Sequence, residues 1–95
     1  MFVVTVTYLK PLNEVDEYLA SHREFLKLGY EMKLLLASGS QVPRTGGIIL
    51  ARGNDKKKLL DFLENDPFKV NNIASYEVVE FNPALFAPEM AELVK

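Results

Sequence analysis

The stretch "YEMKLLLASGSQVPRTGGIILARG", residues 30–53, defines the predicted topology because it holds two strand-like runs with no helix between them. The first run, "YEMKLLLASGS", ends in a Ser-Gly-Ser turn, and the second, "GGIILARG", follows the loop "QVPRTGG". Apolar runs bounded by Gly, Pro and Ser are typical of β-strands, and a short connection favours antiparallel pairing. The middle of the chain is therefore predicted to be a β-hairpin.

Upstream of this hairpin, residues 13–29 ("NEVDEYLASHREFLKLG") have the pattern of an amphipathic helix. Asn13 is expected to cap its N-terminus and Gly29 to end it, since these residue types favour those positions. His22, the only histidine of the chain, falls within the apolar stripe and is expected to face the sheet. The stripe consists of Val15, Tyr18, Leu19, Phe25 and Leu26.

Downstream, residues 54–66 ("NDKKKLLDFLEND") repeat the helical pattern, with Asn54 or Asp55 as the expected N-cap. The outer segments 2–9 ("FVVTVTYL") and 73–81 ("IASYEVVEF") are rich in β-branched and aromatic residues and are predicted to be strands. Segment 2–9 carries apolar residues on both faces, which indicates a strand in the interior of its sheet.

The predicted order of elements is strand, helix, strand, strand, helix, strand, which is the α+β arrangement of ferredoxin-like βαββαβ domains. Residues 1–95 are expected to form a single domain with a four-stranded antiparallel sheet and both helices on one face. The tail 84–95 ("ALFAPEMAELVK") is expected to add a short helix with an apolar side. Because this tail is too small to cover the second face of the sheet, a second subunit is the expected cover, which predicts a homodimer or a higher oligomer.

The composition argues against several classes of function. Eleven Lys and Arg residues against thirteen Asp and Glu give a net charge of −2, whereas nucleic-acid-binding domains are usually basic. Without cysteine and with a single histidine, the chain has too few ligands for a zinc site, so no metal is expected. The N-terminal apolar run is too short to cross a bilayer and lacks a charged leader, which predicts a cytoplasmic protein without membrane contact.

Three features follow one another along the chain: His22 in the first helix, "ASGS" (37–40) after the second strand and "DPF" (66–68) after the second helix. Together with the closing "SYEVVEFNP" (75–83), they resemble the YciI-related family of small bacterial and archaeal proteins. The resemblance implies a dimeric α/β-barrel in which the ferredoxin-like sheets of two subunits pack face to face. It also implies an acid/base pair in each subunit, which corresponds to His22 and Asp66.

The chain departs from the family pattern in two places. Family members often continue the turn of Gly39 with Gly-Pro, whereas here Ser40 follows and the proline comes later, at Pro43. Many also place a glycine after the Asp-Pro-aromatic segment, where this chain has Asn72. Asparagine tolerates the left-handed backbone conformation better than most residues, so an unchanged backbone is expected there. The altered turn is expected to affect the shape of the pocket more than the His–Asp pair.

Two interpretations are open for each member of the pair. Histidine changes charge near neutral pH, so His22 suits a proton shuttle; alternatively, it is a core residue whose ring is satisfied by a backbone carbonyl or by Asp66. Asp66 precedes a proline after a helix, where aspartate commonly bonds nearby backbone amides as part of a turn. A catalytic role for Asp66 would come in addition to that structural one.

Five further residues are candidates for ligand binding. Ser38 and Gly39 lie in the turn after the second strand, where a hydroxyl and backbone amides suit a ligand oxygen, although a plain turn explains them too. Arg44 either binds a carboxylate or phenolate through two hydrogen bonds or is an ordinary exposed loop residue. Tyr8 and Phe68 are candidate pocket walls and equally good core or interface aromatics.

Two classes of function fit these residues. The first is a small, cofactor-free enzyme, lyase- or isomerase-like, in which His22 oriented by Asp66 moves a proton on a small oxygenated compound, in particular a cyclic one. This matches the activities that the resemblance implies, which are dehydrochlorination of a chlorinated hydroxyhydroquinone and, in proteins that share the barrel, isomerisation of a lactone. The second is a non-catalytic dimer that binds a small ligand or serves in assembly. The second class predicts that His22→Ala changes ligand affinity or stability and abolishes no turnover.

Overall fold

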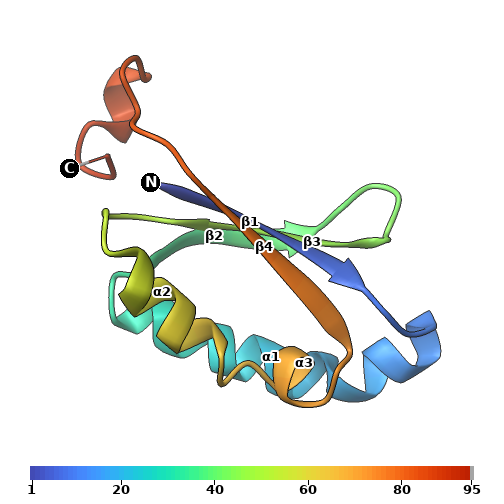
Figure 1. Cartoon of the computed structure of the whole chain (residues 1–95). Coiled ribbons are helices and arrows are strands. Elements are labelled where there is room, and N and C mark those ends of the chain that lie inside the picture. The colour runs from blue at the N-terminus through green and yellow to red at the C-terminus, as the bar shows by residue number, and fades with distance from the viewer. Residues whose placement is uncertain (95) are drawn as a thin grey trace.

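Figure 1 shows the computed structural model, which describes residues 1–94 of the 95-residue chain. Its elements follow the predicted order, with a third short helix before the last strand and a single turn of 3-10 helix near the end. They are β1 (Phe2–Tyr8), α1 (Leu12–Glu31), β2 (Leu35–Ser40), β3 (Gly46–Ala51), α2 (Lys56–Leu63), α3 (Pro67–Val70), β4 (Ala74–Glu80) and the 3-10 helix η1 (Pro88–Met90).

The four strands form one antiparallel sheet in the order β2-β3-β1-β4. β1 lies in the interior, where Val4 pairs with Ile49 of β3 on one side and with Val78 of β4 on the other. β2 and β3 pair as the predicted hairpin. The ferredoxin-like α+β fold predicted from the sequence is therefore confirmed.

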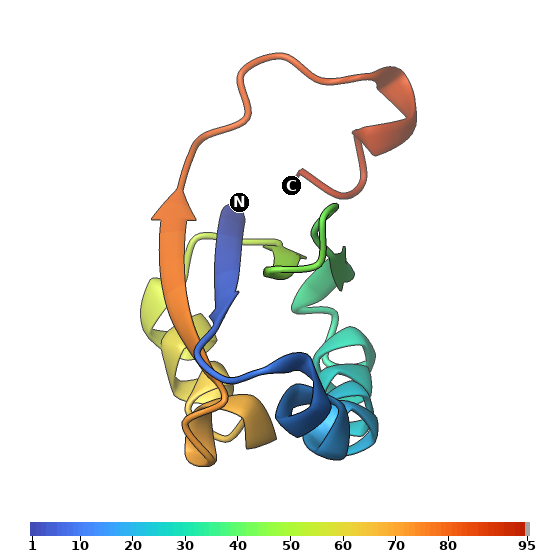
Figure 2. The ribbon, with the colours of Figure 1, turned by 90° about the vertical axis from the view of Figure 1, so that its right-hand side faces the viewer.

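The helices cover one face of the sheet, as Figures 1 and 2 show from two directions. Alternate side chains of β1 point to this face, because successive residues of a strand point to opposite sides. Phe2, Val4 and Val6 are accordingly buried, while Val3 and Thr5 between them are only partly so. The helices complete the core with Val15, Leu26, Leu59, Leu63 and Phe68.

The ends of α1 differ from the prediction. The helix begins at Leu12 and is preceded by Pro11, whose carbonyl accepts from the amides of Glu14 and Val15, so Asn13 is not the N-cap. Proline suits this place because it lacks an amide hydrogen and its ring holds φ near the helical value.

Gly29 does not end the helix, because α1 continues for two residues beyond it, to Glu31. The left-handed conformation falls on Lys33 instead, with φ 58°. Gly29 is buried, and a β-carbon there would lie only 2.6 Å from Cδ1 of Leu35. Its role is thus close packing of α1 on β2, and β2 begins at Leu35 rather than at residue 30.

The region after the second helix contains more structure than the sequence indicated. Asp55 caps α2 as predicted, since its side chain accepts from the amide of Lys58 at 3.1 Å. The segment after α2, for which no helix was predicted, forms α3, with Asp66 as its N-cap. Asn72 then takes the left-handed conformation, with φ 56°, as expected from its side chain.

The chain after β4 lies on the opposite side of the molecule from the helices in both views (Figures 1 and 2). Its predicted helix is a single 3-10 turn, η1, and Leu85 before it is 95% exposed. The last residue of the predicted helical range, Lys95, lies outside the described residues. Among residues 1–94, no helix has both the length and the apolar character needed to cross a membrane.

Candidate functional site

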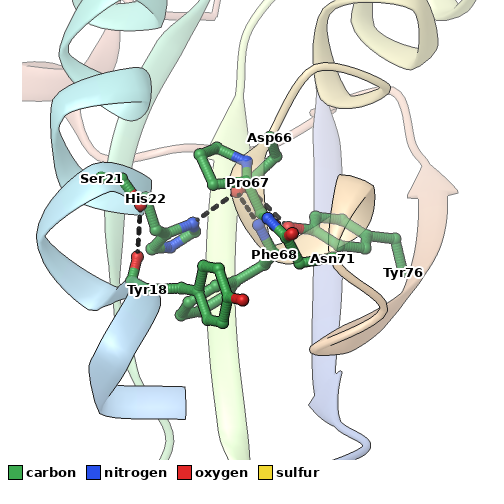
Figure 3. A network of polar contacts seen from close by, with 8 residues as sticks. All are labelled: Tyr18, Ser21, His22, Asp66, Pro67, Phe68, Asn71 and Tyr76. Carbon is green, nitrogen blue, oxygen red and sulfur yellow. Dashed lines mark hydrogen bonds and ion pairs between the residues drawn. The ribbon is translucent and has the colours of Figure 1, made fainter. Parts of the chain in front are cut away.

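The buried carboxylate of Asp66 has hydrogen-bonding partners from three parts of the fold (Figure 3). Its Oδ1 accepts from the backbone amide of Phe68 at 2.9 Å and lies 2.8 Å from Nδ1 of His22. Its Oδ2 accepts from the phenol of Tyr76 at 2.6 Å. Asp66 is fully buried, and burial of a carboxylate is costly unless it is hydrogen-bonded. Here both oxygens have partners.

The local sequence Asp66-Pro67-Phe68 builds half of this arrangement. Asp66 is the N-cap of α3, and Pro67 occupies the first helical position, where its missing amide hydrogen costs nothing. The aspartate side chain can therefore bond the amide of Phe68, a free donor in the first turn. The predicted turn role of Asp66 is present, and the same carboxylate also contacts a side chain of α1.

Tyr76 reaches Asp66 from β4. It pairs with the buried Val6 of β1, so its side chain lies on the face of the sheet that the helices cover, although β4 is an edge strand. Burial, together with the negative charge of Asp66 and the hydrogen bond to it, raises the pKa of Tyr76 far above its ordinary value of 10.0. The phenol therefore stays protonated and acts as a donor to the carboxylate.

The hydrogen bonds indicate which nitrogen of His22 carries the proton. The amide of Phe68 can only donate, so Oδ1 of Asp66 acts as an acceptor, and Nδ1 of His22 supplies a second N–H to it. In the neutral ring this leaves Nε2 with a free lone pair. No hydrogen bond among residues 1–94 uses Nε2, and that part of the chain has no buried side-chain nitrogen without a partner. Nε2 is therefore accessible from outside the protein.

Stacking on Phe68 helps to hold the imidazole in place. The ring of His22 stacks on Phe68 with centroids 3.9 Å apart and an interplanar angle of 2°. Tyr8 meets the same phenylalanine edge to face, with centroids 6.1 Å apart and an angle of 89°. Stacking restricts the tilt of the imidazole and the bond to Asp66 restricts its rotation. The direction of Nε2 is thus set by Asp66 and Phe68, and Tyr8 of β1 packs against the same phenylalanine.

A cavity of about 170 Å³ lies beside His22. Its walls come from α1, from Phe68, from the inner faces of β1 and β3, and from the end of β2. The predicted residues Ser38, Gly39, Tyr8 and Phe68 all line it together with His22. Asp66 does not line it, because the carboxylate lies behind the imidazole, fully buried.

On the β2 side of the cavity, Ser38 forms a hydrogen bond to another hydroxyl. Its Oγ lies 2.6 Å from the phenol oxygen of Tyr30 on α1. Either oxygen can donate, so Ser38 can present a donor or an acceptor to a ligand. Ser40 lines the same wall two residues further on, which places both hydroxyls on one face of the strand.

Arg44, predicted as a ligand-binding residue, is not part of the cavity wall. Its guanidinium forms an ion pair with Asp16 at 2.6 Å and lies 5.6 Å from the ring centroid of Tyr8. These contacts raise the pKa of Arg44, chiefly through the hydrogen bond to Asp16. Arg23 lines the cavity instead.

Sequence reasoning missed Arg23, Tyr30 and Tyr76. The spacing of Leu19, His22, Arg23 and Leu26 places these four residues on one face of a helix, and this signal identifies Arg23. For Tyr76, alternation along the last strand indicates an inward side chain but not its partner. As for metals, residues 1–94 contain no group of three or more His, Asp or Glu side chains suited to hold an ion.

The fold and the site together define a class: ferredoxin-like proteins with a helix-borne histidine bonded to a buried aspartate beside a small cavity. Comparison with known families is more specific. The model of the YCII-related domain matches residues 1–82, so the chain belongs to the YCII-related family, as the sequence resemblance implied. No curated protein matches the chain significantly.

A similar solved structure is that of the 5-chloro-2-hydroxyhydroquinone dehydrochlorinase of Burkholderia phenoliruptrix AC1100, in complex with 2,5-dihydroxybenzoquinone. The two structures superpose with a TM-score of 0.69 over 85% of this chain and 93% of that chain, at 17% sequence identity. At this identity the similarity shows a shared fold.

Proposed function

We propose that this protein is a small-molecule enzyme in which His22, oriented by Asp66, takes up and returns a proton on a small oxygenated compound. The observation that carries the proposal is the 2.8 Å contact between Nδ1 of His22 and Oδ1 of Asp66, with Nε2 accessible beside a cavity. A histidine held by a carboxylate at one nitrogen, with the other nitrogen accessible, is well suited to general acid–base catalysis.

The proposed step is an elimination or an isomerisation. The lone pair of Nε2 accepts a proton from a C–H or O–H of the substrate, and the electron pair of that bond stays on the substrate. In an elimination this pair forms a double bond and expels a leaving group from the neighbouring atom, and His22 then releases the proton to water or to the leaving group. In an isomerisation His22 returns the proton to a different atom. The carboxylate of Asp66 stabilises the imidazolium that forms in between. Such catalysis contributes about 10²- to 10⁴-fold in rate.

The size of the cavity supports a substrate with a single ring. An apolar cavity of about 150 Å³ is sufficient for benzene, and the cavity here measures about 170 Å³. The dehydrochlorinase with the same fold is named for a one-ring compound and holds another in its complex. Aromatic side chains beside His22 also suit a flat ligand.

The active form in this proposal is a homodimer. The face of the sheet opposite the helices carries an apolar patch that the described part of the chain leaves partly or largely open. Val3, Leu50 and Val79 share this face because β1 pairs Val3 with both of the others, and Val79 is 50% exposed. Two such faces in contact would bury the patch and close the sheets into a barrel.

Chloride release from 5-chloro-2-hydroxyhydroquinone is the most direct test. The purified protein is incubated with this compound, and chloride is followed with an ion-selective electrode for wild type, His22→Gln and Ser21→Ala. We expect turnover by wild type and Ser21→Ala, and a loss of about 10²-fold or more in His22→Gln. Ser21 is the matched control because it is the exposed neighbour of His22 on α1.

A second assay covers isomerisation. Proton exchange at carbon is followed by NMR in ²H₂O on a panel of one-ring lactones and hydroxylated quinones. Binding of these compounds by wild type without chloride release and without exchange would overturn the enzymatic proposal. That outcome would instead support a binding module, the second class of function that the sequence allows.

A further inference from the structure

We infer that Arg23 is the anion-binding residue of the cavity, so the ligand is a one-ring compound that carries an ionised oxygen group. This inference rests on the proposed function, because it names the class of substrate for the same site. Arg23 follows His22 directly in the sequence, and both line the cavity.

The geometry of α1 places Arg23 at the mouth of the cavity. Leu19, Arg23 and Leu26 are three or four residues apart and therefore share the helix face from which His22 also extends. Leu26 is buried at 5% exposure, whereas Arg23 is exposed as a whole although it lines the cavity. A long side chain at the rim can place its charged end over an opening while its stem packs on apolar neighbours.

The charge of Arg23 is not neutralised within the protein. Among residues 1–94, no carboxylate forms an ion pair with it, and none of the residues that line the cavity is acidic. Asp66 is fully buried behind His22 and already has three donors. Arg44 offers a contrast, because its guanidinium is already paired with Asp16. The cavity therefore presents the permanent positive charge of the Arg23 guanidinium to its ligand.

The β2 wall of the cavity adds neutral polar groups. Ser38 and Ser40 of β2 line the cavity with hydroxyls, and Ser38 is oriented by its 2.6 Å contact with Tyr30. A guanidinium can bind two oxygens of a planar anion at once, while hydroxyls bind uncharged ring oxygens. A ring with an anionic group and a hydroxyl group could bind Arg23 through the first and the two serine hydroxyls through the second.

The same charge also assists the proposed reaction. When a proton leaves the substrate for Nε2 of His22, the electron pair that remains adds negative charge to the ring. A guanidinium already held at the ring stabilises this additional charge in the transition state. Arg23 thus acts in binding and as an electrostatic support, and the proton itself goes only to His22.

Benzoate and benzamide test the inference because they have nearly the same shape and differ in charge. Each compound is titrated into ¹⁵N-labelled protein and followed through amide shifts of residues that line the cavity. The variants are Arg23→Gln, Arg23→Lys and the control Lys27→Gln. Lys27 is an exposed cation one turn along α1 that pairs with Glu24, so this variant changes the net charge by the same amount.

We expect wild type and Lys27→Gln to bind benzoate about tenfold or more tightly than benzamide. Arg23→Gln should lose about tenfold in affinity for benzoate and less than about twofold for benzamide, and Arg23→Lys should recover part of the loss. Added salt should weaken benzoate binding to wild type more than to Arg23→Gln.

The inference is overturned if wild type fails to bind benzoate, if it binds benzamide equally well, or if Arg23→Gln keeps the wild-type affinity. An equal loss in Lys27→Gln would also overturn it, because the effect would then come from net charge. The outcome is separable from that of the proposed function. Charge-selective binding through Arg23 without chloride release or proton exchange would support the anion site and refute catalysis. Turnover that depends on His22 but not on Arg23 would support catalysis and refute the anion site.

Discussion

The phenol of Tyr76 donates a 2.6 Å hydrogen bond to Oδ2 of Asp66 and leaves the other carboxylate oxygen to His22 and to the amide of Phe68. With donors on both oxygens, rotation of the carboxylate would break at least one bond in a buried place. Tyr76 is therefore a positioning residue: it acts on the imidazole through Asp66.

The first prediction concerns this bond. Tyr76→Phe should lower the free energy of unfolding by about 1.5–3 kcal/mol, the usual range for a hydrogen bond to a charged group. Denaturant unfolding measures the change. Tyr30→Phe is the control, since it removes an exposed bond between two hydroxyls and should cost less than about 1 kcal/mol. In a catalytic assay, Tyr76→Phe should lower kcat with little change in KM, and equal stability losses in the two variants would contradict this account.

The raised pKa of Tyr76 predicts a loss of stability at alkaline pH. Above about pH 10 the unfolded chain releases the phenol proton while the folded protein retains it, so the unfolded state binds fewer protons. The free energy of unfolding then falls as pH rises, by up to about 1.4 kcal/mol per pH unit from this group. The stabilisation is complete below pH 10. Denaturant unfolding between pH 9 and 11.5 should show a shallower fall in Tyr76→Phe, and parallel curves would refute the prediction.

Asp66→Asn separates the structural role of Asp66 from its effect on His22. Asparagine also caps helices well, so the bond to the amide of Phe68 and the short helix α3 should survive. The imidazole, however, loses the charge that favours a hydrogen on Nδ1. We expect a mixture of tautomers in ¹⁵N NMR spectra and a fall in turnover of about 10²-fold. A spectrum that still shows only the Nδ1–H form would count against the assignment.

At Gly46 the hairpin leaves no room for a side chain beside β1. A β-carbon there would overlap the carbonyl oxygen of Val6, and backbone atoms cannot give way as a side chain can. Gly46→Ala should therefore destabilise the protein by about 1–3 kcal/mol. Gly39→Ala is the matched control, because a β-carbon at Gly39 meets no atom within 4 Å and should change stability by less than about 0.5 kcal/mol. Thermal or denaturant unfolding compares the two.

The proposed dimer predicts a sedimentation result. Wild type should sediment as a dimer, and Val79→Glu should shift it towards monomer, because a charge on the outer face of the sheet would be buried in the interface. Val70→Glu serves as the control, since Val70 is 67% exposed on α3, on the helical side of the molecule. A monomeric wild type at micromolar concentration would exclude the proposed dimer.

The order of the main elements was predictable from the sequence because it depends on local periodicity. The sheet topology followed from that order, which matches the ferredoxin-like arrangement. Alternation along residues 2–9 and the helical stripe around His22 report directly which side chains face the core. The first and last residues of α1 were not predicted correctly from the sequence. Pro11 and Lys33 take the terminal positions that Asn13 and Gly29 were expected to take, since Gly29 is needed for packing against Leu35.

Some features of the candidate site were likewise predictable from the sequence, whereas others depended on the tertiary structure. By itself, the sequence determined that His22 faces the core and that Asp66 follows the second helix in a turn, where its side chain can bond an amide. Helix period and turn chemistry both act within a few residues. Only the tertiary structure decided that Tyr76 completes the carboxylate and that Arg23, not Arg44, lines the cavity. The side chains bonded to Asp66 are distant in the sequence: His22 is 44 residues away and Tyr76 is 10 residues away. Such partners are selected by the packing of the helices on the sheet, which no local pattern encodes.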